Sequence, residues 1–285
     1  MTFDQIINDI DNRSFKPIYF LQGDEPYFID LITDKLANGV LDEMQKAFNL
    51  NIMYGKDSDV ASIDNMARRF PMGAEYTLVI VKEAQSLNKI EDLIYYASSP
   101  SESSILVLAY KYKTLDKRKK LHKAIAKNGV LFTAEKVYDN KIPKWIQNYL
   151  AKKNIDIEPS AGVILTEYLG NDLGKICNEL DKLILTLPDG QNKIQAEHIE
   201  TNIGISKDFN HFELMKALAK KNILKANRII RYFGENQKLN NINQTISSLF
   251  YFFSKVLALH FIQSTSSREI AATLQINPYF LGDYR

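Results

Sequence analysis

The stretch that decides the fold is Lys16 to Lys35, which reads KPIYFLQGDEPYFIDLITDK. Its residues Ile18 to Leu21 form a short apolar run, Gln22 and Gly23 interrupt the run, and apolar residues then recur at helical spacing after Pro26. This pattern predicts a strand, a tight turn and a helix. In nucleotide-binding α/β domains, such a turn is a glycine-rich loop that holds phosphate at the N-terminus of the helix.

The turn carries carboxylates where a phosphate-binding loop would carry glycines, a lysine and a hydroxyl. Asp24 and Glu25 complement the helix dipole and occupy the place that an anion would take. The motif Gly-x-x-x-x-Gly-Lys-Ser/Thr does not occur in the sequence. An active ATPase would also place two acidic residues after the strand Thr77 to Val81, where this chain has Lys82 and Glu83. The predicted degenerate nucleotide site, which needs no cofactor, comprises Gly23, Asp24, Glu25, Lys82 and Glu83.

Composition narrows the class of protein. With 285 residues, of which 45% are hydrophobic, the chain is long enough for two or three domains. Its 36 basic and 34 acidic residues give a net charge of +2, which excludes a globally basic nucleic-acid coat protein. The single cysteine, the absence of a signal-peptide core and the lack of a long apolar run predict a cytoplasmic protein without membrane contact. The four histidines lack metal-ligand spacing, so we expect no metal site.

The chain up to about residue 140 alternates between predicted strands and helices. The predicted strands are Ile18 to Leu21, Asn49 to Tyr54, Thr77 to Val81, Ser104 to Ala109 and Val130 to Thr133. Strands separated by helical segments favour a mostly parallel sheet with helices on both faces. From Ile142 onward, apolar residues recur almost only at helical spacing. We therefore expect an α/β domain followed by all-α domains.

Eight short segments lie in the order found in one protein family. They are Pro17 to Tyr27, Phe48-Asn49, Tyr54 to Asp57, Ala67 to Met72, Val79 to Ala84, Asn171 to Leu173, Asn178 to Leu183 and Phe209 to Leu214. Together they resemble the delta subunit of bacterial DNA polymerase III. The resemblance implies a degenerate AAA+ ATPase-like (RecA-like) domain at 1–140, a small helical domain at 141–208 and a helical collar at 209–285. The chain ends soon after a helix-start signal at Asn277-Pro278, so we expect a collar that is truncated at its C-terminus.

The resemblance also implies a function and partners. Delta subunits bind the beta sliding clamp and open one interface of its ring, so that the clamp can be loaded on primed DNA during DNA replication. The collar joins the gamma/tau and delta prime subunits in a ring of five. The chain would then be a non-catalytic subunit of a polymerase holoenzyme. That holoenzyme is a DNA-directed DNA polymerase, which is a nucleotidyltransferase.

The resemblance places Phe70 at the contact with the clamp. In the family, two exposed apolar residues at a helix end enter a pocket on the clamp, and the matching positions here are Arg69 and Phe70. The second apolar side chain of this predicted wedge would be Met66 or Met72, with Pro71 ending the helix. Spacing alone favours the opposite interpretation, because Phe70 shares a helical stripe with Met66 and such stripes usually face the core.

A basic segment, Lys111 to Lys127, is opposed within its own sequence only by Asp116. Its residues Lys113, Lys117, Arg118 and Lys120 are candidates for contact with DNA or an acidic partner, and such contacts would weaken with salt. The alternative is a solvated helix face, which is typical of charge runs without an aromatic platform. The pattern favours the solvated face.

Two other classes of function remain open at this stage. One is a divergent P-loop nucleotide hydrolase, which would bind ATP with magnesium. The other is a degenerate AAA+ scaffold or DNA adaptor, which would bind DNA through the basic segment independently of Phe70.

Overall fold

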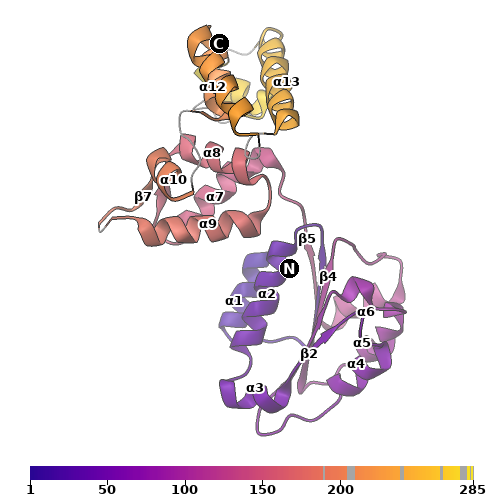
Figure 1. The fold of residues 1–285 in the computed structure, drawn as a ribbon. Helices are drawn as coiled ribbons and strands as arrows, with labels where there is room; N and C mark the ends of the chain where they lie inside the picture. The colour runs from indigo at the N-terminus through magenta and orange to yellow at the C-terminus, as the bar shows by residue number, and fades with distance from the viewer. Residues whose placement is uncertain are drawn as a thin grey trace. The chain divides into compact units, whose positions relative to one another are not determined.

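The computed structural model describes residues 1–188, 190–203, 209–237, 241–263, 266–276, 281–282 and 284. Two compact units are present, Met1–Lys136 and Val137–Arg285 (Figure 1). Residues 204–208, at the predicted end of the small helical domain, and the helix start at 277–278 lie outside the described residues. The further division of the C-terminal part at residue 208 stays a prediction.

A five-stranded sheet forms the centre of the first unit. Its strands are β1 (Ile18–Gly23), β2 (Leu50–Tyr54), β3 (Thr77–Lys82), β4 (Ser104–Lys111) and β5 (Val130–Ala134). They lie in the order β2-β3-β4-β1-β5, and every neighbouring pair is parallel. The predicted parallel sheet is therefore confirmed, with β1 between β4 and β5.

Helices cover both faces of this sheet (Figure 1). The α-helices of the unit are α1 (Phe3–Asp11), α2 (Pro26–Gly39), α3 (Glu43–Asn49), α4 (Val60–Ala67), α5 (Ile94–Ser98) and α6 (Lys120–Asn128). The side chains of β1 alternate between two cores, since Tyr19 and Leu21 pack with α1 and α2, whereas Ile18 and Phe20 pack with α4, α5 and α6. Burial on both faces explains why the central strands are continuous apolar runs in the sequence.

Helix α4 is shorter than its apolar spacing predicts. Asp59 caps it with a capping box, but the helix ends at Ala67 rather than at Phe70. The residue before a proline disfavours helical geometry, so Pro71 affects the chain before its own position. The Tyr96 hydroxyl on α5 donates to Ala67 O at 3.5 Å, and burial raises the pKa of Tyr96 to about 12.

The second unit is mainly helical. Its α-helices are α7 (Ile142–Ala151), α8 (Pro159–Leu169), α9 (Leu173–Thr186), α10 (Ala196–Ile203), α11 (His211–Ala219), α12 (Ile223–Glu235), α13 (Ile242–Leu259) and α14 (Ser267–Leu274). The structure adds a short parallel pair, β6 (Asp156–Ile157) with β7 (Lys193–Ile194), which helical periodicity alone does not reveal. Cys177 is buried on α9 as a small apolar side chain. None of the described helices has the length and apolar content needed to cross a membrane.

Candidate functional site

The backbone N–H groups that follow β1 are hydrogen-bonded within the chain. Gly23 N donates to Lys113 O at 3.0 Å, while Asp24 N and Glu25 N both donate to Ala134 O, at 3.0 and 3.3 Å. A phosphate-binding loop needs such N–H groups free to point at the anion. These three donors already have acceptors, so the loop is closed to phosphate at the edge of the sheet where P-loop folds bind it.

The residues of the loop also fit this closed arrangement sterically. Gly23 has a φ of +120°, and a Cβ at this position would lie 2.3 Å from Ala134 O, so only glycine permits this approach of β1 to β5. Glu25 is 5% exposed and is the N-cap of α2, where its side chain accepts from Tyr27 N at 3.4 Å. Its carboxylate thus lies at the helix N-terminus, where a phosphate would otherwise lie.

The other two residues of the degenerate nucleotide site follow β3. The carboxyl ends of β1 and β3 reach the same edge of the parallel sheet, with β4 between them. Lys82 is half-buried, and Glu83 is exposed in a left-handed conformation with φ of +51°. Gln85 Oε1 accepts from Lys111 N at 3.0 Å, which ties the segment after β3 to the end of β4. At the two positions after β3 where an active ATPase carries acidic residues, this chain thus has one carboxylate, that of Glu83.

Phe70 and Met72 project from the loop between α4 and β3. Phe70 is 86% exposed and Met72 is 66% exposed, so the interpretation of Phe70 as a core residue is wrong. Met66 is half-buried and packs against the core under α4. Pro71 is half-buried between the two exposed side chains. The structure therefore brings Phe70 and Met72 together on the surface and turns Met66 toward the interior.

Helix α3, which the sequence interpretation missed, adds two exposed apolar side chains near this loop. Met44 is 83% exposed and Phe48 is 69% exposed, and they lie four residues apart on one face of the helix. The sequence signal for this helix is its capping box, in which Asp42 and Gln45 bond each other's backbone N–H groups.

The basic segment is partly neutralised by acids from elsewhere in the fold. Lys111 pairs with Asp30 at 2.6 Å, and Lys119 pairs with Glu91 at 3.0 Å. Arg118 binds Asp116 at 2.7 Å, and its hydrogen bonds hold the pKa of that carboxyl below its usual range. The remaining candidates are exposed and pair with no carboxylate among the described residues; they are Lys113, Lys117 and Lys120.

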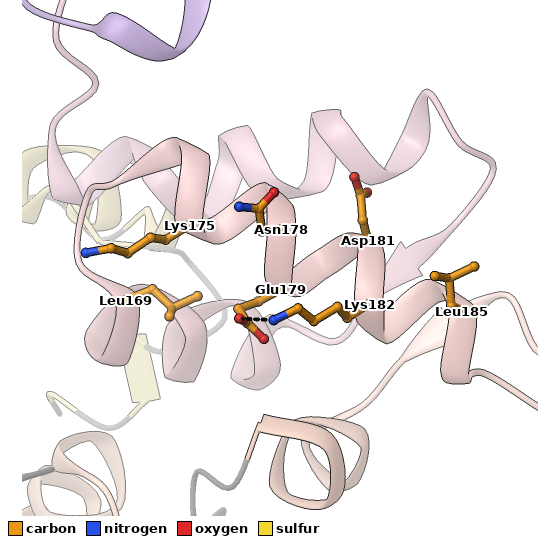
Figure 2. A pocket seen from close by; sticks show the side chains of 7 residues that line it. All are labelled: Leu169, Lys175, Asn178, Glu179, Asp181, Lys182 and Leu185. Atoms are coloured by element: carbon orange, nitrogen blue, oxygen red, sulfur yellow. Dashed lines mark hydrogen bonds and ion pairs between the residues drawn. The ribbon is translucent and has the colours of Figure 1, made fainter.

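A surface pocket of about 410 Å³ lies along α9 in the second unit (Figure 2). Its lining residues are Leu169, Lys175, Asn178, Glu179, Asp181, Lys182 and Leu185. Every charged side chain in the lining has an ion-pair partner: Glu179 with Lys182 at 2.8 Å, Asp181 with Lys153 and Lys175 with Asp172. The pocket therefore offers a ligand no unpaired charge. Throughout the described chain, no three His, Cys, Asp or Glu side chains gather in a way that could hold a metal ion.

The strand order, the helices on both faces and the site after β1 define an AAA+-like fold of the kind found in clamp loader subunits. Residues 19–135 match the family described as DNA polymerase III, delta subunit. Over 292 residues the chain is 25% identical to DNA polymerase III subunit delta of Bacillus subtilis strain 168, covering 98% of this chain and 83% of that protein. These matches confirm the resemblance seen in the sequence, and the match to the family lies within the first unit.

A solved structure supports the same fold. The Bacillus subtilis DNA clamp loader delta protein superposes with a TM-score of 0.62 at 22% identity, over 99% of this chain and 86% of that chain. The superposition shows that the two chains share a fold.

We expect the closed loop after β1 to prevent nucleotide binding. Binding of a phosphate would require Gly23, Asp24 and Glu25 to give up the hydrogen bonds to Lys113 O and Ala134 O. Isothermal titration with ATP and magnesium should therefore show no saturable heat. Saturable binding would contradict the closed loop and would favour the interpretation as a divergent hydrolase.

Proposed function

We propose that this chain is a non-catalytic delta subunit that binds the beta sliding clamp through Phe70 and opens one interface of the ring during DNA replication. The observation that carries the proposal is the exposure of Phe70 in the loop after α4, in the segment that resembles the family's clamp contact. An aromatic side chain exposed on a fixed loop is typical of the anchor of a protein interface. Met72 supplies the second apolar side chain, since the matching position holds Arg69.

The proposed mechanism is conformational capture. A surface that binds the open or strained clamp interface more tightly than the closed one shifts the clamp toward opening by the difference in binding free energy. This mechanism requires no bond to be made or broken by this chain. The closed loop at Gly23 supports the proposal, because it leaves ATP hydrolysis to the ATPase subunits, which would regulate access to Phe70.

Assembly with the gamma/tau and delta prime subunits is proposed for the C-terminal helices. Helix α13 has two apolar stripes: Phe252, with Leu249 and Val256, packs against α11 and α12, whereas a second stripe is exposed. The exposed stripe consists of Ile242, Ile246, Phe250, Phe253 and Leu257. An exposed apolar stripe of this length is typical of an interface between subunits.

Contact with primed DNA is proposed only within the assembled loader. Of the four predicted candidates, Lys113, Lys117 and Lys120 are available for phosphates, because an ion pair with Asp116 occupies Arg118. A few exposed lysines on a chain of net charge +2 would bind DNA weakly when alone. The proposed place of action is the cytoplasm.

We expect Phe70→Ala to weaken clamp binding by about 2 kcal/mol or more, because truncation removes the anchor of the interface. Surface plasmon resonance on the clamp of the same organism, without nucleotide, measures the change. Tyr95→Ala is the matched control, since Tyr95 is an exposed aromatic residue on α5 in the same unit. A loss below about 1 kcal/mol would remove Phe70 from the contact.

We expect the double substitution Ile246→Ser with Phe250→Ser to abolish assembly with the gamma/tau and delta prime subunits, because it interrupts the exposed stripe of α13 without touching Phe252. Size-exclusion chromatography of the mixed subunits measures assembly. Leu224→Ser, at an exposed site on α12, is the control and should assemble normally. Normal assembly of the double variant would contradict the role of this stripe.

A further inference from the structure

Asn49, the last residue of α3, is a buried side chain that holds the loop of Phe70. It is 1% exposed, and its amide bonds both backbone groups of Met72: Oδ1 accepts from Met72 N at 2.7 Å, and Nδ2 donates to Met72 O at 3.0 Å. Nδ2 also donates to Gln45 O within α3, at 3.0 Å. One amide thus reproduces the two-point connection of a hydrogen-bonded pair of strand residues.

The loop has a second attachment on the other side of Phe70. Thr77 Oγ1, at the start of β3, donates to Arg69 O at 3.3 Å. Phe70 and Pro71 therefore lie between two attached residues, Arg69 and Met72, and the proline ring fixes one further backbone angle. Phe70 is exposed on a fixed backbone, so little of its binding free energy would be lost in ordering the loop.

Helix α3 has a capped first turn and a further contact with α2. Its capping box satisfies the first turn, and Lys46 Nζ donates to Asn38 Oδ1 on α2 at 3.4 Å. Phe48 immediately precedes Asn49 in the chain, and Asn49 holds Met72, so the exposed side chains of Phe48 and Met72 come from adjoining segments. The end of α3 that carries Phe48 is thus held against the segment that carries Phe70 and Met72.

We propose that Asn49 joins α3 and the Phe70 loop into one docking surface for the sliding clamp, in which Phe48 contacts the clamp and Asn49 is a positioning residue. The inference rests on the proposed function. The clamp is the occupant because Asn49, the residue after Phe48, is hydrogen-bonded to Met72 in the same loop as Phe70, the proposed clamp contact. Two attached segments also explain how a loop with one aromatic residue can present a rigid interface.

The experiment compares clamp affinity and amide hydrogen exchange for wild type, Phe48→Ala and Asn49→Ala. Phe48→Ala should weaken binding about fivefold, because it removes contact area beside the anchor. Asn49→Ala should weaken binding about tenfold and speed exchange of the Met72 amide, because the released loop must be ordered on binding. Wild type and both variants are used as the whole 285-residue chain, and the clamp of the same organism is the binding partner.

Matched controls separate positioning from stability. Tyr95→Ala controls for loss of an exposed aromatic side chain, and Asn128→Ala controls for loss of an amide, since Asn128 Nδ2 donates to Ala97 O at 2.8 Å between α6 and α5. Both controls should bind the clamp like wild type. If Asn49→Ala fails to fold, Phe48→Ala still decides, because Phe48 is exposed.

The outcomes distinguish this inference from the proposed function. If Phe70→Ala weakens binding but Phe48→Ala does not, the clamp contact stands and its extension onto α3 is wrong. If Asn49→Ala binds no more weakly than Asn128→Ala, the positioning role is wrong. If neither Phe70→Ala nor Phe48→Ala changes the affinity, the proposed function and the inference both fall.

Discussion

The backbone N–H groups of Gly23, Asp24 and Glu25 donate hydrogen bonds to carbonyl groups of the same chain. None of the three is therefore free to bind phosphate. The sheet keeps the strand order and the helix N-terminus with which P-loop folds bind phosphate. In this chain the donors are satisfied and the Glu25 carboxylate lies at the helix N-terminus. Under the proposed function, the chain acts through binding energy rather than through nucleotide chemistry.

The exposed apolar side chains of the first unit that the proposals use, Phe48, Phe70 and Met72, are far in sequence from the closed loop at Gly23. Asn49 attaches α3 to the loop after α4, and Thr77 attaches the same loop to β3. Phe70 is thereby exposed without being free to collapse onto the core. In the second unit, α13 is held in place by one apolar stripe that packs against α11 and α12. Its other apolar stripe is exposed. Both exposed surfaces thus depend on buried side chains: Asn49 of the neighbouring α3 for the Phe70 loop, and Phe252 of the same helix for α13.

The sequence was enough to predict the sheet, because its central strands are apolar runs between turn residues and are buried on both faces. The sequence did not decide whether Phe70 is buried or exposed, because apolar spacing does not show at which residue the helix ends. Pro71 was a signal that the helix ends before Phe70. The sequence interpretation missed α3, whose capping box at Asp42 was readable, because seven residues give too short a period. The closed loop could not be predicted, since Gly23 and Asp24 bond residues far along the chain.

The most direct test of a subunit that works by binding alone is ring opening by this chain in isolation. A fluorophore pair across one interface of the clamp reports opening when the protein is added, first without nucleotide and then with ATP and magnesium. We expect opening without nucleotide, the same extent of opening with it, and none with Phe70→Ala. Opening that requires ATP when only this chain and the clamp are present would contradict the central claim.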